Sequence, residues 1–180
     1  MEPEKASLAW DEPAMVTAAQ RNPADFSPLY ERYVHRIFQY CLYRTGSRHD
    51  ADEMTAETFM RALEYLPRYR WQGAPFLAWL YRIANSVIHK SRRRSRPVAP
   101  LPDLPWNAAP DLGLAEQEMR QDLLRELYRL PDIQQQLLVL RFAQGLTYEE
   151  IAQVVDRSPA ALRQLVYRAL QTLRERMTRQ

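Results

Sequence analysis

The sequence has little of three things that define large classes of proteins. It contains one cysteine, Cys41, so no disulfide can form within the chain, and a reducing compartment is its natural setting. It contains only 4 glycines in 180 residues, which argues against an all-β fold built on many tight turns. No hydrophobic run approaches the roughly 18 residues of a membrane-spanning helix, and residues 1–10 lack the features of a secretory signal. We therefore expect a cytoplasmic protein without a membrane span.

The sequence also lacks the residue patterns of catalysis and of metal binding. The histidines His35, His49 and His89 have no spacing that would hold a metal ion. No glycine-rich phosphate loop and no glycine-flanked serine nucleophile is present. The acidic cluster from Asp50 to Glu57 is more typical of a solvated helix start or a docking face than of an acid–base pair. These absences predict a protein that is not an enzyme and that needs no cofactor.

What the sequence does contain is an uneven distribution of charge. The formal net charge is +3, but residues 25–96 carry 13 basic and 7 acidic side chains, and 12 of these 13 are arginine. The guanidinium fork of arginine suits phosphates and base edges better than the ammonium group of lysine does. This excess of arginine weakly favours nucleic-acid binding by the first half of the chain.

Apolar residues that recur every three or four positions predict three amphipathic helices in the first half. Their apolar stripes run from Phe26 to Cys41, from Ala51 to Leu66 and from Phe76 to Ile88. Gly46 and Pro67 are expected to end the first two helices. Cys41 falls on the first stripe, which favours a position in the core over a role as a redox sensor.

A proline-rich segment separates the two halves. Residues 97–113 contain five prolines and little helical periodicity, which is typical of a linker. Fully extended, this segment would span roughly 50 Å at about 3.1 Å per residue. The alternative is that Leu101, Leu104 and Trp106 pack back onto a neighbouring domain. We expect an all-α protein of two small helical domains, residues 1–96 and 114–180, joined by this linker.

The second half is predicted to end in a helix-turn-helix. Helices are expected over residues 114–130, 133–142, 147–155 and 158–177. Thr147 and Glu150 form a capping box, and Ser158 followed by proline is a second helix start. The turn between them is short, and its position 156, an aspartate, is expected to adopt a left-handed conformation at some cost in stability. Leu162 is apolar where the second helix would pack back.

Two interpretations fit this pair of helices. The second helix presents polar side chains on its outer face, and glutamine and arginine pair with adenine and guanine in the major groove of DNA. The alternative interpretation is that these polar side chains form only the solvated face of an ordinary helical hairpin. The two caps, the turn length and the apolar spacing together favour DNA binding.

Aromatic and cationic residues are interleaved at the end of the first half. Trp71, Phe76, Trp79 and Tyr81 lie near a series of arginines, a pattern that suits single-stranded nucleic acid because bases stack and phosphates pair. Phe76 and Trp79 also fall on the buried stripe of their helix, so core packing is the stronger interpretation for these two. The arginine run after residue 90 alone is equally consistent with a solvated tail.

Short motifs occur in a fixed order in the two halves. The first half holds Leu29-Tyr-Glu-Arg-Tyr33, the run from Asp50 to Phe59, and Phe76-Leu-Ala-Trp-Leu-Tyr-Arg-Ile-Ala84. The second holds Leu130-Pro131, the run from Leu137 to Phe142, Gly145-Leu-Thr-Tyr-Glu-Glu-Ile-Ala152 and Arg168-Ala-Leu170. Together they resemble the second and fourth conserved regions of bacterial RNA polymerase sigma factors over residues 14–96 and 114–178. With only these two regions, the chain is similar to the small extracytoplasmic-function group.

The resemblance implies three binding surfaces. Core polymerase, through the clamp helices of its largest subunit, would be bound by Asp52, Glu53, Thr55, Glu57, Thr58 and Arg61. The melted minus-ten element would be held by Arg68, Arg70, Trp71, Arg82, Asn85, Ser86, Lys90, Arg92, Arg93 and Arg94. The duplex minus-thirty-five element would be contacted by Thr147, Ser158, Ala160, Arg163, Gln164, Tyr167 and Arg168.

The function that this resemblance implies is an alternative sigma factor. Its partners would be core polymerase (clamp helices and flap) and promoter DNA in duplex and melted form. An anti-sigma factor is a further partner that the resemblance allows. A second hypothesis is a stand-alone helix-turn-helix regulator, which would dimerise to match two half-sites. A third is a helical interaction protein that binds polymerase as a decoy.

Overall fold

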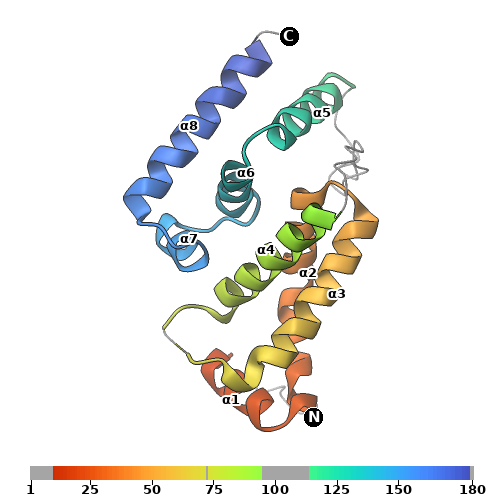
Figure 1. Ribbon diagram of the computed structural model, residues 1–180, viewed down its shortest axis with the longest axis vertical. Helices are drawn as coiled ribbons and strands as arrows, with labels where there is room; N and C mark the ends of the chain where they lie inside the picture. The colour runs from red at the N-terminus through yellow and green to blue at the C-terminus, as the bar shows by residue number, and fades with distance from the viewer. Residues whose placement is uncertain (1–9, 72, 95–113, 179–180) are drawn as a thin grey trace, which may run out of the picture.

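The computed structural model describes residues 10–71, 73–94 and 114–178, and within these ranges the chain forms helices and connecting turns without strands. This agrees with the predicted all-α class. The linker expected at residues 97–113 lies outside the described residues. Figure 1 shows an elongated molecule with the N-terminal half (residues 10–94) below and the C-terminal half (residues 114–178) above.

The N-terminal half is built on three long helices. α2 (Ser27–Thr45), α3 (Arg48–Tyr65) and α4 (Phe76–Arg94) pack side by side, as the periodicity predicted. Gly46 ends α2 and donates its N–H to the carbonyl of Leu42. Its φ of 73° lies in the left-handed region, which glycine adopts without a steric penalty. Ser47 caps α3 by accepting the N–H of Asp50. Short 3-10 turns, η1 (Pro23–Phe26) and η2 (Leu66–Arg68), complete this half.

A further helix, α1 (Glu12–Arg21), was not predicted from the sequence. Asp11 caps it, and its buried residues Val16 and Ala19 cover the core. The Glu12 carboxylate accepts a hydrogen bond from the Tyr33 hydroxyl and another, at 3.1 Å, from the Phe76 N–H. An anion at this position satisfies a free donor at the start of α4 and favours the helix dipole.

The C-terminal half contains four shorter elements and one long helix. They are α5 (Leu114–Tyr128), α6 (Asp132–Leu138), the π-helical turn η4 (Val139–Ala143), α7 (Tyr148–Val154) and α8 (Pro159–Thr178). Their core is aliphatic, with Leu137, Leu140, Ile151 and Leu162 fully buried. The order and positions of these elements agree with the expected helices.

The turn of the helix-turn-helix differs from the expectation in one respect. Thr147 and Glu150 form the predicted capping box, and Ser158 accepts the N–H of Ala161 at 3.3 Å. The aspartate at position 156 does not adopt the left-handed conformation, since positive φ values in the described residues occur only at glycines. The chain instead turns through a bond from the Arg157 N–H to the Val155 carbonyl at 2.7 Å. The expected cost at this position is therefore absent.

Candidate nucleic-acid interface

The outer face of α8 displays the residues expected to contact duplex DNA. Leu162, Val166, Ala169 and Leu173 form its buried stripe, so the side chains between them point away from the core. The predicted residues Ala160, Arg163, Gln164, Tyr167 and Arg168 are all exposed. Thr147 and Ser158 are also exposed, although both hydroxyls already serve as helix caps.

Two of these side chains have partners on the same surface. Arg163 pairs with Glu149 at 3.0 Å and lies over the ring of Tyr148, 5.3 Å from its centroid. The Tyr167 hydroxyl accepts a hydrogen bond from Gln171 at 2.8 Å. Both contacts are at the solvent-exposed surface, where an ion pair contributes little stability, so DNA could replace them at small cost.

The residues expected to hold melted DNA are distributed along α4 and the loop before it. Arg68, Arg70 and Arg82 line a cavity of about 290 Å³ together with Tyr69 and Trp79, so that cations and ring faces meet in one place. Trp71 is 39% exposed in the loop, while Phe76 is fully buried and Trp79 half-buried. The interpretation that Phe76 belongs to the core is confirmed.

Farther along α4 the expected residues have different environments. Asn85 is half-buried and accepts a long hydrogen bond, 3.5 Å, from the buried Tyr40 hydroxyl, whereas Ser86 and Lys90 are exposed. Arg92 is engaged by the C-terminal half through Asp132. Arg93 and Arg94 lie in the last turn of α4, and their side chains fall outside the described part of the structure.

The surface expected to bind core polymerase is smaller than predicted. On α3, Asp52 and Glu53 are exposed, and the half-buried Glu57 and Arg61 form an ion pair of 2.6 Å. Thr55 and Thr58 are buried, and their hydroxyls donate to the carbonyls of Ala51 and Met54 at 2.6 Å. These two threonines face the core, which corrects their assignment as contact residues.

The two halves meet through polar contacts that the sequence did not reveal. Arg36 donates to the Gln144 carbonyl at 3.0 Å, and the buried Tyr81 hydroxyl donates to the Gln144 side chain at 2.8 Å. Arg82 donates to the Gln153 carbonyl at 2.6 Å. The Tyr128 ring of α5 also lies close to Gly46, 3.0 Å from the point where a Cβ atom would be. These contacts place the C-terminal half against α2 and α4.

Asp132, at the start of α6, is the centre of a polar cluster between the halves. Its carboxylate accepts hydrogen bonds from Arg44 at 2.5 Å and from Arg92, and His89 Nε2 lies 3.1 Å from its second oxygen. Arg44 is fully buried on the same face of α2 as Tyr40 and Ile37. A charged residue on this otherwise apolar stripe is the sequence feature that could have indicated a contact with another part of the chain. Burial, and then the neighbouring Arg44, lower the pKa of Arg92.

Burial also fixes the protonation of the central residues of α2. Desolvation raises the pKa of Tyr40 to about 12 and that of the Cys41 thiol to about 12. Cys41 is 0% exposed, so its thiol remains protonated and shielded at neutral pH. The prediction that Cys41 belongs to the core is confirmed.

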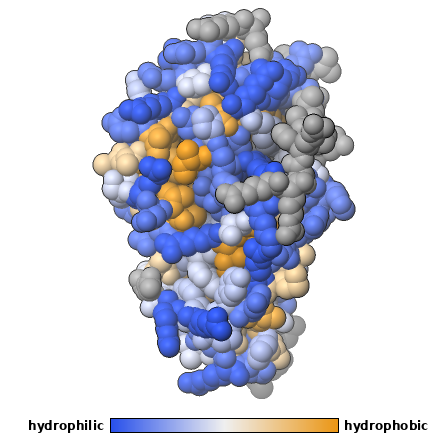
Figure 2. Space-filling view, in the orientation of Figure 1, coloured by the Kyte–Doolittle hydropathy of each residue, from blue (hydrophilic) through white to orange (hydrophobic). Residues whose placement is uncertain are grey.

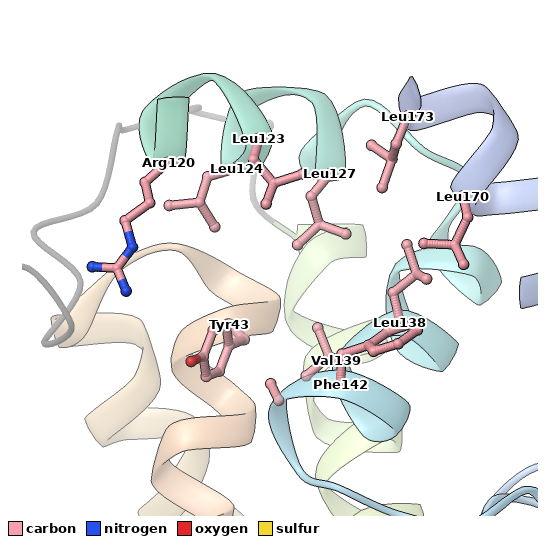
Figure 3. A pocket seen from close by; sticks show the side chains of 11 residues that line it. Tyr43, Arg120, Leu123, Leu124, Leu127, Leu138, Val139, Phe142, Leu170 and Leu173 are labelled. Carbon is pink, nitrogen blue, oxygen red and sulfur yellow. The ribbon is translucent and has the colours of Figure 1, made fainter. Parts of the chain in front are cut away.

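An apolar groove lies beside this junction. Figure 3 shows Leu123, Leu124 and Leu127 of α5 facing side chains of η4 and α8, with Tyr43 of α2 on the opposite wall. The groove encloses about 370 Å³, and Arg120 lies at its edge. Phe142, at 61% exposure, and Leu170, at 43%, belong to its lining. Figure 2 shows hydrophobic residues gathered over the region of α6 and α8 on this face.

Comparisons with known proteins match both halves of the chain. The family models Sigma-70 region 2 and Sigma-70 region 4 match residues 29–97 and 120–173, respectively. The chain is 36% identical over 166 residues to the ECF RNA polymerase sigma factor BldN of Streptomyces coelicolor, covering 88% of this chain and 63% of BldN. It is 34% identical over 152 residues to SigD of Mycobacterium tuberculosis, covering 77% of this chain and 70% of SigD.

Solved structures show the same fold. CnrH, in complex with the cytosolic domain of CnrY, matches with a TM-score of 0.71 and 20% identity, over 93% of this chain and 97% of CnrH. RpoE of Bartonella quintana, in complex with the anti-sigma factor NepR, matches with a TM-score of 0.65 and 19% identity, over 86% of this chain and 97% of RpoE. Together with the two family models and the 34% identity to SigD, this shows that the chain belongs to the sigma-70 family of RNA polymerase sigma factors, in the extracytoplasmic-function group.

Proposed function

We propose that this protein is an alternative sigma factor that binds core RNA polymerase, recognises promoter DNA and starts transcription. The observation that carries the proposal is the presence of both sigma regions, in order, in one chain whose helix-turn-helix has an exposed polar face. The protein acts as a regulatory subunit in the cytoplasm and is not an enzyme, because the chemistry belongs to the polymerase. The alternative of a stand-alone regulator is not favoured, since it leaves the match of residues 29–97 unexplained.

Three segments divide this work. Residues 1–96 dock on polymerase and hold the minus-ten element, residues 97–113 link the domains, and residues 114–180 contact the minus-thirty-five element. We expect Arg163 and Gln164 on α8 to reach base edges in the major groove; both lie in its first turns and are exposed, which supports this role.

The minus-ten element is held by the cavity between Arg68, Arg70 and Arg82. Aromatic faces of Tyr69 and Trp79 in the same cavity suit an unstacked base, and the arginines suit the phosphates beside it. Trp71 in the adjoining loop adds an exposed ring. Binding by the free protein should be weak and sensitive to salt, because the net charge is only +3.

Core polymerase is bound by the exposed side of α3. Of the predicted set, Asp52 and Glu53 are exposed and Glu57 and Arg61 are half-buried, and Met60 on the same helix is 63% exposed. A mixed polar and apolar surface of this kind suits a protein partner.

We also infer control by an anti-sigma factor, since the similar RpoE was solved in complex with the anti-sigma factor NepR. The apolar groove between α5, η4 and α8 suits the apolar face of a helix.

The proposed function is tested by transcription in vitro. Core polymerase from the source bacterium is incubated with fragments of its genome, with and without the protein. We expect new start sites that share two short upstream elements. Stable binding to core without new starts would favour a decoy, and absence of binding to core would overturn the proposal.

A further inference from the structure

Arg163, on the exposed face of α8, contacts two residues of the first turn of α7. Its Nη2 atom donates to the Glu149 carboxylate at 3.0 Å, and its Cζ atom lies 5.3 Å from the centroid of the Tyr148 ring. Arg141 lies near the same ring, at 5.1 Å, and donates to the Leu146 carbonyl at 2.8 Å. The guanidinium group of Arg163 therefore has a defined position where the two helices of the helix-turn-helix meet.

Stability does not explain the ion pair between Arg163 and Glu149. The two side chains are 55% and 66% exposed, and ion pairs in such positions contribute little to folding. The capping box of α7 uses Glu150 and not Glu149. A carboxylate on a surface that approaches DNA also weakens binding, because it repels the phosphates. A role in recognition would account for an acidic residue at this place.

The ion pair presents hydrogen-bond donors and an acceptor side by side. A guanidinium group has five N–H donors in a planar fork, so Arg163 keeps donors for a base while Nη2 contacts Glu149. In the major groove, guanine presents the acceptors N7 and O6, and the paired cytosine presents its N4 amino group as a donor beside them. Guanine O6 and cytosine N4 lie about 2.9 Å apart in the base pair, close to the 3.0 Å between Arg163 and Glu149. Two donors followed by an acceptor therefore match the edge of one G·C pair, whereas an A·T pair presents acceptor, donor and acceptor.

We propose that Arg163 and Glu149 together read one G·C base pair of the minus-thirty-five element, with Arg163 donating to guanine and Glu149 accepting from cytosine N4. This inference rests on the proposed function and adds Glu149, which the resemblance did not assign to the DNA surface, as a specificity-determining residue. A carboxylate accepts several hydrogen bonds, so Glu149 keeps its contact with Arg163 while it contacts the base. In an A·T pair, thymine O4 replaces cytosine N4 and faces the carboxylate, acceptor against acceptor. Glu149 thus rejects the wrong pair.

The experiment measures transcription by core polymerase with the full chain, on promoters in which each position of the upstream element is changed in turn. The unmodified protein should prefer G·C at one position at least. We expect Glu149→Gln, whose amide also donates, to lower that preference over A·T about tenfold and to change the preferences elsewhere by less than about twofold. Arg163→Ala should lower the preference at the same position. Loss at different positions in the two variants, or an unchanged preference in Glu149→Gln, would overturn the proposal.

Glu175→Gln is the matched control, because Glu175 is exposed farther along α8 and the substitution removes the same charge. It should leave every base preference unchanged. A purely electrostatic role of Glu149 would raise the use of all promoters equally without changing the preference, and this result would also overturn the proposal.

Thermal unfolding separates recognition from a structural role. Glu149→Gln should unfold within about 2 °C of the control, since the ion pair is exposed. A clearly lower midpoint for Glu149→Gln would assign the lost preference to structure and overturn the proposal. Failure of the unmodified protein to start transcription on core polymerase would instead count against the proposed function, so the two failures are distinguishable.

Discussion

The two helices expected to contact DNA, α4 and α8, have nearly the same length but are held in the fold differently. α4 has 19 residues and is buried on more than one side, with Phe76 and Leu80 in the N-terminal core and Tyr81 against Gln144 of the other half. α8 has 20 residues and buries a single stripe, while its opposite face is exposed. The residues proposed to contact duplex DNA are therefore already displayed, whereas some of those proposed to contact melted DNA are engaged within the protein.

The largest loss of stability is expected from a substitution in the buried part of α4. Phe76→Ala should lower the free energy of unfolding by about 3–5 kcal/mol, because its removal leaves a large cavity in the core. Phe76 is 0% exposed, and its ring centroid lies 5.1 Å from that of Trp79 and 5.5 Å from that of Tyr69. Urea denaturation measures the change. Trp71→Ala in the neighbouring exposed loop is the control and should cost less than about 1 kcal/mol.

A somewhat smaller effect is expected from the single buried stripe of α8. Leu162→Ala should cost about 2–5 kcal/mol, since this side chain is 0% exposed where α7 and α8 cross. Leu170→Ala, on the same helix but 43% exposed, should remain within about 1 kcal/mol. If the two variants were equally unstable, α8 would be buried on more sides than the structure shows.

Substitutions on the exposed face of α8 should change promoter use without changing the free energy of unfolding. Gln164→Ala and Arg163→Ala are each expected to weaken use of the upstream duplex element by about 1–3 kcal/mol, the value of a good base contact. Transcription from promoters with and without that element measures the effect. Arg174→Ala, exposed farther along α8, is the matched control. Unchanged promoter choice in both test variants would remove α8 from the recognition surface.

The smallest effect concerns the cap that precedes α7. Thr147→Ala should lower the free energy of unfolding by about 1 kcal/mol, because the Glu150 N–H loses its acceptor at 3.2 Å. Thermal unfolding measures it. Thr178→Ala, where the hydroxyl bonds only within the last turn of α8, should have less effect. A cost as small as that of the control would show that the capping box does not stabilise the helix-turn-helix.

Local patterns predicted most of the helices, because burial of one stripe is recorded in residues three or four positions apart. Thr55 and Thr58 lie at positions of the predicted stripe from Ala51 to Leu66, and the structure buries both. The stripe was therefore a better guide to these two residues than their assignment as polymerase contacts. α1 is short, with only Val16 and Ala19 buried, so its periodicity was too weak to detect.

The contacts between the halves were beyond this kind of prediction. Arg44 and Asp132 are separated by 88 residues, and no local pattern relates them. A charged residue on an apolar stripe can show that a distant partner is needed, but it does not identify the partner. For the same reason, the sequence indicated which residues of α4 suit nucleic acid but not which of them the C-terminal half engages.

The end of α2 carries an evolutionary constraint that follows from two unrelated demands on one position. Gly46 has a φ of 73°, which favours glycine, and a side chain there would meet the Tyr128 ring of the other half at 3.0 Å. Asparagine tolerates the left-handed backbone but still brings a Cβ atom, so it would meet only the first demand. Natural variation at this position should therefore depend on the residue at position 128, and the two should change together across descendants of this gene.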